Sequence, residues 1–297
     1  MLIDQAGKQW YKGNLHTHTT CSDGRKSPEE AIEIYRSAGY NFLALTDHWV
    51  LSRTRQAGSI LLLSGCEYNV GLDPADGIYH IVGIGMKENP CLERSADRSP
   101  QSIIDAVNGA GGLAILAHPA WSLNTPQQIL PLRGLAGTEI YNSVSDLPHN
   151  ARPDASLVVD QLACSGCYLP CFASDDSHFY DGEETKSFIW VQSSSCCEQD
   201  ILAAIRKGDF YASQGPRLNL WRDGDRIEIR CTPAVHIVIY SAAVWSGHRV
   251  FSGTGITQAS YPIAAEDHFI RVEIIDADGR CAWTSPYHLV YEGGPFT

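Results

Sequence analysis

The sequence predicts an α/β protein in two parts, a β/α barrel over residues 1–212 and a small all-β sandwich over residues 213–297. In the first part, continuous apolar runs alternate with helical segments, which is typical of buried parallel strands with helical crossovers. Polar residues recur where these apolar runs end. In the second part, short runs rich in β-branched and aromatic residues replace the helical segments, which favours a sandwich of the immunoglobulin type. Seven or so strands suit a barrel better than an open sheet, although the sequence alone does not decide whether the barrel closes.

The first strand is expected over residues 10–15, and it leads into the motif His16-x-His18, with Asp23 five residues later. Alternate side chains of a strand point to the same face, so the two imidazoles should project together from the strand end. The sequence Ser27-Pro-Glu-Glu then predicts a helix start, with Ser27 as the N-cap. Asp23 is therefore expected on the loop between this strand and this helix.

The following strands of the first part repeat the same pattern of an apolar run with polar residues at its end. The run over 41–46 ends in Asp47-His48, the run over 60–66 ends in Glu67, and the run over 113–117 ends in His118. The other expected strands are 78–85 with His80 near its start, 137–142, 167–173 ahead of Asp176-x-His178, and 188–192. The other expected helices are 99–107, one ending at Cys164, and 200–206.

The second part contains turn signals such as Asp223-Gly224 and Asp278-Gly279 between its short apolar runs. The strands expected there are 226–231, 236–240, 268–275, 281–284 and 288–291.

Composition narrows the function classes. The 297 residues are 44% hydrophobic and 19% charged, which is typical of a globular protein. The net charge of −12 argues against general nucleic-acid binding, because phosphate contacts need clustered Lys and Arg. No apolar run has the length of a membrane span or of a signal-peptide core, so a cytoplasmic protein without membrane contact is expected. The ten cysteines are expected as free thiols, and Cys164-x-x-Cys167 as packed residues and not a zinc site.

Nine side chains at or beside the strand ends are candidate metal ligands. Imidazole and carboxylate ligands without thiolate suit zinc, manganese or iron. Nine ligands exceed what one ion uses, so two or three divalent ions per chain are expected, with a carboxylate bridging them. The candidates are His16, His18, Asp23, His48, Glu67, His80, His118, Asp176 and His178.

These motifs, in this order, resemble those of the PHP (polymerase and histidinol phosphatase) family over about the first 212 residues. The resemblance implies a distorted, TIM-like (β/α)7 barrel with a trinuclear metal site. It also implies the ligands of each ion, which are His16, His18, Glu67 and Asp176 for the first, Glu67, His80 and His118 for the second, and Asp23, His48 and His178 for the third. Residues 202–216, followed by a β-domain, are similar to PHP-like metallohydrolases that include carbamate-insecticide hydrolases.

The expected reaction is hydrolysis of a small phosphorylated molecule by attack of a metal-bound hydroxide on phosphorus. Glu67, Asp176, His178 and Asp47 are the residues expected to take part in catalysis, with Asp47 either orienting a ligand or capping the next helix. The alternatives are a carboxyl-ester or carbamate hydrolase with the same metals, and a metal-binding regulatory module without turnover. The sequence does not predict the oligomeric state.

Substrate recognition is expected from three loops, 51–59, 69–77 and 143–155. Asn142, Arg152 and Lys186 are candidates for contact with a substrate phosphate, although each also fits an ordinary loop or surface position. Asp175 should point away from the metals, because it alternates with Asp176. Five histidines lack a motif and are expected to be structural or exposed: His149, His236, His248, His268 and His288.

Overall fold

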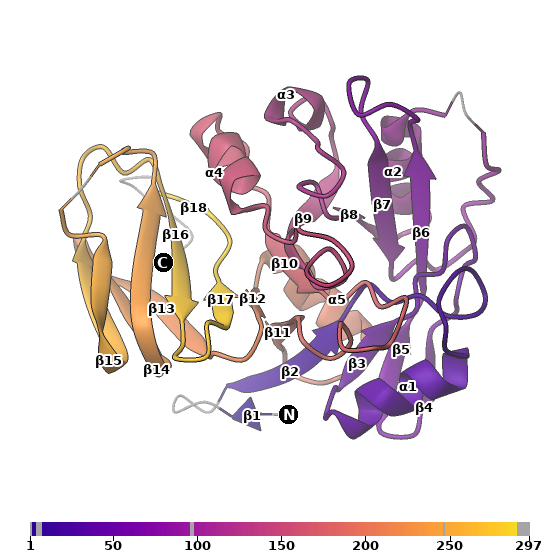
Figure 1. The fold of residues 1–297 in the computed structure, drawn as a ribbon, viewed down its shortest axis with the longest axis horizontal. Helices are drawn as coiled ribbons and strands as arrows, with labels where there is room; N and C mark the ends of the chain where they lie inside the picture. The colour runs from indigo at the N-terminus through magenta and orange to yellow at the C-terminus, as the bar shows by residue number, and fades with distance from the viewer. Residues whose placement is uncertain (1, 4–7, 96–97, 246, 290–297) are drawn as a thin grey trace.

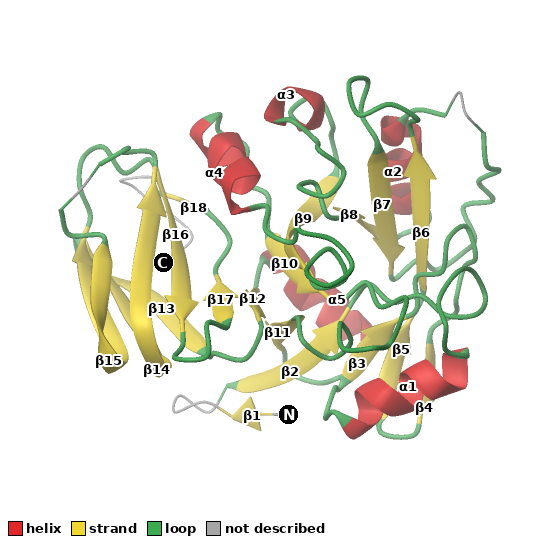
Figure 2. Cartoon of the chain, viewed as in Figure 1, coloured by secondary structure: helices red, strands yellow, loops and turns green. Residues whose placement is uncertain are grey.

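The computed structural model describes residues 2–3, 8–95, 98–245 and 247–289. Within them the chain is a mixed α/β protein with two sheets and five helices (Figures 1 and 2). The helices are α1 (Pro28–Ser37), α2 (Pro100–Gly109), α3 (Pro126–Ile129), α4 (Ser156–Cys164) and α5 (Glu198–Lys207).

The larger sheet has thirteen strands and runs through both predicted parts of the chain. In the order of their hydrogen-bonded neighbours, ten of them are β13 (Leu218–Asp223), β14 (Arg226–Ser241), β16 (Phe269–Ile275), β17 (Cys281–Trp283), β12 (Phe210–Ser213), β11 (Phe188–Gln192), β2 (Gln9–Asn14), β3 (Phe42–Ala44), β5 (Ile60–Leu63) and β4 (Arg55–Ala57). The other three are β1 (Leu2–Ile3) beside β2, β15 (Val250–Pro262) beside β14, and β18 (Tyr287–His288) beside β16.

The smaller sheet contains the strands β10 (Cys171–Ser174), β9 (Leu135–Asn142), β8 (Leu113–Leu116), β7 (Tyr79–Ile84) and β6 (Gly65–Val70), in that order. The prediction of parallel strands is wrong for β7, which runs antiparallel to both β6 and β8. A fully apolar run shows that a strand is buried on both faces, but it does not show the direction of its neighbours. Residues 73–77, whose sequence is typical of a turn between strands, join β6 and β7 as a hairpin.

The hydrogen-bonded ladders of the described residues do not close into a barrel. The two sheets are instead joined by isolated bridges, one between Thr17 and Ser177 and one between His48 and Glu67. The first bridge lies just beyond the ends of β2 and β10. The second joins the segment after β3 to the strand β6. The predicted polar residues therefore lie where the two sheets meet.

Helix α1 confirms the predicted start. The Ser27 hydroxyl accepts the backbone amide of Glu30, and the Glu30 carboxylate accepts the backbone amide of Ser27 in return. Its last turn is followed by Gly39 in the left-handed region. The loop that carries Asp23 is thus held between a strand end and a rigidly capped helix.

The C-terminal part is all β in the residues described, as predicted, but its strands differ from the expected ones. The runs 226–231 and 236–240 form one bent strand, β14, whose pairing with β15 shifts register between Arg230 and His236. Pro233 lies within this bulge, where a residue without an amide hydrogen is tolerated. The predicted strand 167–173 begins only at Cys171, and 290–291 of the run 288–291 lie outside the described residues.

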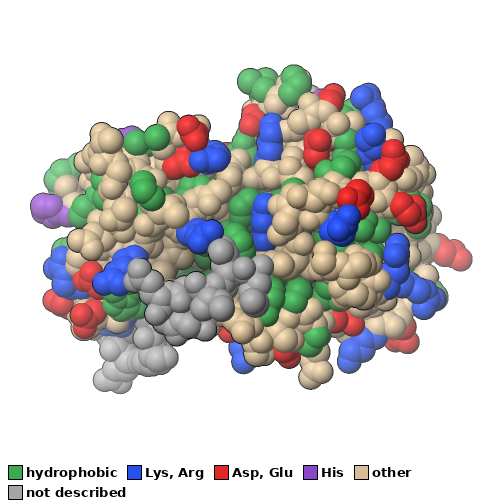
Figure 3. Space-filling view, turned by 90° about the horizontal axis from the view of Figure 1, so that it is seen from below, with side chains coloured by type: hydrophobic (Ala, Val, Ile, Leu, Met, Phe, Trp, Pro, Cys, Tyr) green, Lys and Arg blue, Asp and Glu red, His purple; other side chains and the backbone are tan. Residues whose placement is uncertain are grey.

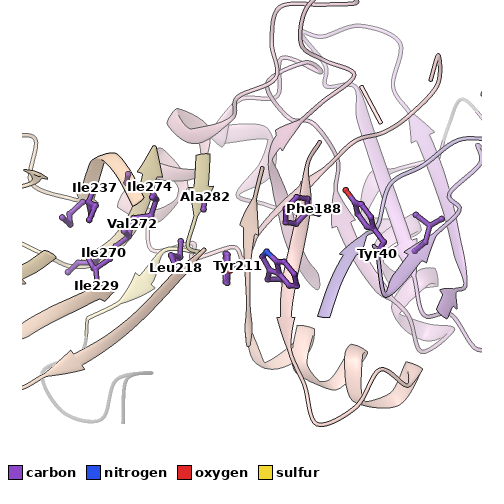
Figure 4. Close-up of a cluster of buried hydrophobic side chains, with 14 of the residues drawn as sticks. Tyr40, Phe188, Tyr211, Leu218, Ile229, Ile237, Ile270, Val272, Ile274 and Ala282 are labelled. Atoms are coloured by element: carbon purple, nitrogen blue, oxygen red, sulfur yellow. The ribbon is translucent and has the colours of Figure 1, made fainter. Parts of the chain in front are cut away.

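The described strands after residue 213 all belong to the larger sheet, so the immunoglobulin-like arrangement is not confirmed. Pairing of β12 with β17 carries the sheet across the predicted boundary between residues 212 and 213, which itself remains a prediction. One cluster of buried side chains also crosses this boundary, from Tyr40 and Phe188 through Tyr211 to Ile237 and Ile270 (Figure 4). The two parts therefore share one hydrophobic core.

The surface is mixed in charge. On the face in Figure 3, Lys and Arg side chains are interspersed with Asp and Glu and do not gather into one basic patch. Among the described residues, no helix has both the length and the apolar character needed to cross a membrane. All ten cysteines are free thiols.

Candidate metal centre

The nine predicted ligands lie together where the two sheets meet. His16 and His18 follow β2, and His48 follows β3. Glu67 lies on β6, and His80 on β7. The other four are Asp23 before α1, His118 after β8, and Asp176 and His178 after β10. The structure thus brings every predicted ligand to one place.

The innermost group consists of His16, His18, Glu67 and Asp176, which are all buried. The Nε2 atoms of the two histidines lie 3.2 Å and 3.0 Å from Oε2 of Glu67. Both also lie 3.0 Å from Oδ1 of Asp176. Four ligand atoms therefore surround one small volume, as they do around a bound divalent ion.

A second group opens towards solvent. It consists of His18, Asp23, His48 and His178, whose ligand atoms lie within 4.8 Å of one another. Asp23 accounts for its openness, since 53% of its side chain is exposed. Its carboxylate oxygens lie 3.5 Å from Nε2 of His178 and 3.6 Å from Nε2 of His48. This group contains the three ligands that the PHP resemblance implies for one ion and adds His18.

Glu67 connects these groups with a third. Its Oε1 lies 2.8 Å from Nδ1 of His80 and 3.4 Å from Nε2 of His118, on the side opposite to the histidines that face Oε2. His48 also approaches Oε2, at 3.2 Å from its Nδ1. A carboxylate whose two oxygens face different sets of imidazoles has the arrangement of a bridging ligand between metals.

Two buried atoms of the cluster lack a hydrogen-bond partner, Oδ1 of Asp176 and Nδ1 of His48. The imidazole nitrogens come within 3.0 Å of Oδ1 of Asp176, but none has the direction of a hydrogen bond. Lone pairs that converge on a common point in this way fit a cation better than they fit one another. The residues present therefore suit divalent metals.

The charges of the cluster shift the pKa values of its members. Burial opposes the charged form of His18, but Asp176 and Glu67 outweigh it and raise the His18 pKa to about 9. Burial likewise opposes ionisation of Glu67, but His16 and His80 hold the pKa of that carboxyl well below its usual range. Without metal, His18 therefore forms ion pairs with the two carboxylates, and a metal that binds there has to displace its proton.

Sequence reasoning missed Glu139, a buried residue of β9. Its Oε1 lies 2.8 Å from Nδ1 of His16, and its Oε2 accepts the backbone amide of His118 at 2.9 Å. It also accepts hydrogen bonds from the side chains of Asn142 and Ser174. An acid in the middle of the strand predicted over 137–142 was the signal that pointed to it, because a buried carboxylate needs partners.

Asn142 is corrected from a substrate contact to a support of the cluster. Its side chain is fully buried and donates to Oε2 of Glu139 at 2.8 Å and to Oδ2 of Asp176 at 3.2 Å. Arg152 and Lys186 are exposed, and neither lines the pocket beside the cluster. The substrate contacts predicted for these three residues are therefore not supported.

Asp47 supports the loop that carries Asp23 and is not itself one of the candidate ligands. Its carboxylate accepts the backbone amide and the hydroxyl of Thr19, each at 2.7 Å, and the hydroxyl of Ser22 at 2.8 Å. These bonds hold the loop that presents Asp23. Of the two alternatives predicted for Asp47, these contacts fit the one in which it orients a ligand, and its hydrogen bonds among the described residues include no helix cap.

Asp175 points away from the cluster, as expected. Its carboxylate accepts hydrogen bonds from the side chains of Asn14, Tyr35 and Ser143, and from the backbone amides of residues 185–187. Burial raises the pKa of Asp175 to about 7 in spite of these bonds. It ties β2 and α1 to the segment after β10.

A pocket of about 310 Å³ opens beside the cluster. This volume is at the lower end of small-molecule sites, which span roughly 300–1,000 Å³. Seven of the nine candidate ligands line it, and its other described lining residues are Trp121, Val144, Ser145, His149, Asn150 and Phe179. None of the described lining residues is Lys or Arg. Of the three predicted recognition loops, only 143–155 reaches the pocket, and Trp121 was missed.

Comparison with known proteins gives a fold relationship. No protein-family model and no curated protein sequence matches the chain. Among solved structures, it is similar to a two-domain protein containing a predicted PHP-like metal-dependent phosphoesterase from Bacteroides vulgatus ATCC 8482. The similarity covers 97% of each chain, with a TM-score of 0.56 and 14% sequence identity. The chain has this two-domain PHP-like fold. At this identity, the likeness establishes the fold and not the reaction.

Two other solved structures overlap with part of the chain. One is an amidohydrolase from Chromobacterium violaceum with bound sulfate, which has 18% identity and a TM-score of 0.41 over 58% of this chain and 89% of its own. The other is described as a metal-dependent phosphoesterase from Bifidobacterium adolescentis ATCC 15703, with 16% identity and a TM-score of 0.38 over 56% and 87%. These TM-scores are too low to add to the PHP-like fold relationship.

Proposed function

We propose that this PHP-like chain is a metal-dependent hydrolase that binds two or three divalent ions and cleaves a small phosphate ester. The observation that carries the proposal is Glu67, whose two oxygens face five imidazoles in overlapping groups. A buried carboxylate shared in this way can bind one metal ion with each of its oxygens. Zinc, manganese and iron all suit the imidazole and carboxylate donors.

The residues that would hold the ions follow from the three groups. His16, His18, Glu67 and Asp176 would hold the buried ion, and Asp23, His48 and His178 would hold the exposed one. His80 and His118 would complete a third site with Glu67. When bound, the ions supply a hydroxide nucleophile at neutral pH and neutralise the charge that develops on the phosphoryl oxygens.

The protein's own residues prepare this site. Glu139 accepts from Nδ1 of His16, which leaves Nε2 of His16 directed at the cluster. Asn142 holds Oδ2 of Asp176, so that the other oxygen faces the two imidazoles. Trp121, Val144 and Phe179 form the apolar part of the pocket wall, which limits the water around a bound substrate.

A second candidate function is hydrolysis of a carboxyl ester or carbamate with the same metals. The observation that favours it is the absence of Lys and Arg from the described lining of the pocket. A doubly charged phosphate would depend on the ions alone for neutralisation, whereas a neutral ester needs no basic side chain. The small, partly apolar pocket accepts either substrate.

The test combines metal analysis with paired substrates. Metal content per chain is measured in purified protein, and the sample is assayed with manganese on p-nitrophenyl phosphate and p-nitrophenyl acetate. Two or three ions and preferential phosphate release support the phosphoesterase, whereas cleavage of the acetate alone selects the ester hydrolase. Bound metal without either activity points to a binding module, and the absence of metal after reconstitution overturns the proposal.

A matched pair of variants controls this test. Glu67→Gln keeps the size of the shared ligand but removes its charge, so metal and activity should be lost together. Glu33→Gln makes the same chemical change on the exposed face of α1, where Glu33 pairs with Arg36 at 2.6 Å. It should leave both metal content and activity at the wild-type level. Full activity of Glu67→Gln with its metals depleted would rule out the mechanism.

A further inference from the structure

His149 lines the pocket and pairs with Asp181 behind it, apart from the nine candidate ligands. His149 lies on the loop between β9 and α4, and its Nε2 is 2.8 Å from Oδ1 of Asp181. The imidazole stacks on Phe179, with ring centroids 4.1 Å apart and planes 19° apart. Both rings line the pocket, and 17% of the His149 side chain is exposed. The imidazole is therefore fixed in direction at the pocket wall.

The contact with Asp181 decides which nitrogen remains available. A carboxylate only accepts hydrogen bonds, so Nε2 of His149 carries the proton in this pair. Its Nδ1 has no hydrogen-bond partner among the described residues. An imidazole anchored at one nitrogen and free at the other has the arrangement of a general acid or base, with the carboxylate as its orienting group.

The neighbouring Glu183 does not turn this arrangement into another metal site, although its Oε2 lies 3.8 Å from Nε2 of His149. Its Oε1 accepts the backbone amides of His178, Phe179 and Tyr180. Its Oε2 accepts the amide of Asp181 at 3.2 Å. Both oxygens are thus used to hold the loop in place, which leaves His149 and Asp181 as a pair.

The composition of the pocket wall singles out His149. Apart from the candidate ligands, its described lining residues are Trp121, Val144, Ser145, His149, Asn150 and Phe179. Of these six, only His149 carries an imidazole, the side chain that most often serves as a general acid or base. A reaction that needs a proton donor away from the metals therefore has one residue in this wall to supply it.

We propose that His149 is the general acid that protonates the leaving group, and this proposal rests on the proposed hydrolase function. As the oxygen of water bonds to phosphorus, the bond between phosphorus and the ester oxygen breaks. For this step the imidazole is doubly protonated, with one proton on Nε2 held by Asp181 and the other on Nδ1. The Nδ1 proton passes to that ester oxygen, which leaves as a neutral alcohol. The proton lost by the attacking water returns through solvent to the imidazole, so the sum is ester plus water giving alcohol plus phosphate. Asp181 is a positioning residue for this step.

The experiment compares leaving groups that differ in their need for a proton. The wild type and His149→Gln, both with their metals, are assayed on p-nitrophenyl phosphate, phenyl phosphate and an alkyl phosphate. Loss of a general acid lowers kcat about 10²–10⁴-fold where the leaving group needs protonation. The p-nitrophenolate ion leaves without a proton, so its kcat should fall less than about tenfold. A uniform loss over all three substrates, or no loss, overturns the proposal.

A second readout does not depend on turnover. In zinc-loaded protein labelled with ¹⁵N-histidine, the His149 ring signals are identified by their absence in His149→Gln. Addition of phenylphosphonate should move the Nδ1 signal of His149 as it meets the phosphonate oxygens, and an unchanged signal contradicts the proposal. His248→Gln, an exposed histidine of the C-terminal part, is the matched control and should behave as the wild type in both assays.

Failure of the hydrolase assignment is distinguishable from failure of this inference. If the wild type releases no phosphate but cleaves p-nitrophenyl acetate, the phosphoesterase assignment is wrong. The wild type and His149→Gln are then compared on p-nitrophenyl, phenyl and alkyl acetates. Selective loss on the poor leaving groups then supports His149 as the acid, and uniform loss rejects it. If the wild type cleaves neither series, the general-acid role is rejected together with the hydrolase.

Discussion

Nδ1 of His16 lies 2.8 Å from Oε1 of Glu139, and both side chains are buried. The other oxygen of Glu139 accepts the backbone amide of His118 at 2.9 Å. One acid of β9 therefore positions two candidate ligands that come from different strands. Carboxylates that accept from the outer nitrogen of a ligating imidazole orient the ring and raise its basicity, so the residue behind the ligand contributes to metal affinity.

We expect Glu139→Gln to weaken metal binding by about 10–100-fold, because the neutral amide no longer stabilises charge on His16. The fold should be kept, since glutamine fills the same space. Zinc affinity is measured by competition with a coloured chelator, and Glu33→Gln on the surface of α1 is the control. Wild-type affinity in Glu139→Gln would show that Glu139 only fills space behind the site.

We expect Asp47→Ala to empty one site selectively. Asp47 holds Thr19 and Ser22, so its loss frees the loop that presents Asp23 to the exposed group. The buried group meets this loop at His18, whose Nδ1 lies 3.4 Å from the Ser22 hydroxyl. Nε2 of His18 faces Asp176 instead, so this group should stay occupied. Metal per chain, measured after dialysis against metal-free buffer, should fall by about one ion relative to wild type. Equal loss from all sites, or no loss, would contradict a positioning role for Asp47.

The strand ends could be predicted from the sequence, but the neighbours of each strand could not. Apolar runs marked β3, β5 and β8 because burial on both faces removes polar residues. The direction of β7 depends on a hairpin turn, and the continuity of β14 depends on a bulge that tolerates Pro233. Both are properties of pairing between segments, which a single run of residues does not record.

The same division applies to the site. Each of the nine candidate ligands stands in a local motif, and the structure brings them together. The supporting contacts join residues that are distant in sequence, 123 positions apart for His16 and Glu139, and 32 apart for His149 and Asp181. An acid within a predicted strand marks Glu139, but no local pattern shows which residue it pairs with. The partners of Glu139 and His149 could therefore be recognised only once the chain was folded.

The charges of the cluster predict opposite effects of pH on the metal-free and metal-loaded protein. The pKa of His18 is raised from 6.5 to about 9, so its ion pairs stabilise the metal-free fold below about pH 6.5 and are lost as the pH rises through 9. The pKa of Glu67 is lowered, so its contribution is present above its usual range and is lost only in acid. Metals compete with protons for the histidines, so their stabilising effect grows over the same rise in pH.

Thermal unfolding tests these opposite effects between pH 6.5 and pH 9. The two limits correspond to the ordinary pKa of His18 and to its raised pKa. With a chelator present, Tm should fall across this interval, whereas with excess zinc it should hold or rise, so that the two curves diverge. Glu67→Gln should show a smaller divergence than the wild type, because the sites that share Glu67 no longer bind metal. Parallel curves for the wild type would mean that the histidines do not exchange protons for metal.

A buried ion pair joins the C-terminal part to α4. The Arg271 guanidinium of β16 is fully buried and donates two hydrogen bonds of 2.9 Å to the carboxylate of Asp160. It also lies 4.1 Å from the centre of the Tyr240 ring and 3.6 Å from a carboxylate oxygen of Glu273. Because α4 follows the loop that carries His149, this pair anchors one wall of the pocket to the C-terminal sheet.

Asp160→Asn should therefore lower the free energy of unfolding by about 2–4 kcal/mol, since it leaves a buried guanidinium with only one carboxylate nearby. The surface control Glu33→Gln should cost no more than about 1 kcal/mol. Both are measured by urea unfolding, and metal content should stay unchanged in each. Replacing both partners with apolar residues, Asp160→Leu with Arg271→Met, removes the unpaired charge and should be less destabilising than Asp160→Asn alone. If the double variant has a lower free energy of unfolding than Asp160→Asn, shape at this contact matters more than charge. The ion pair is then not what holds α4 in place.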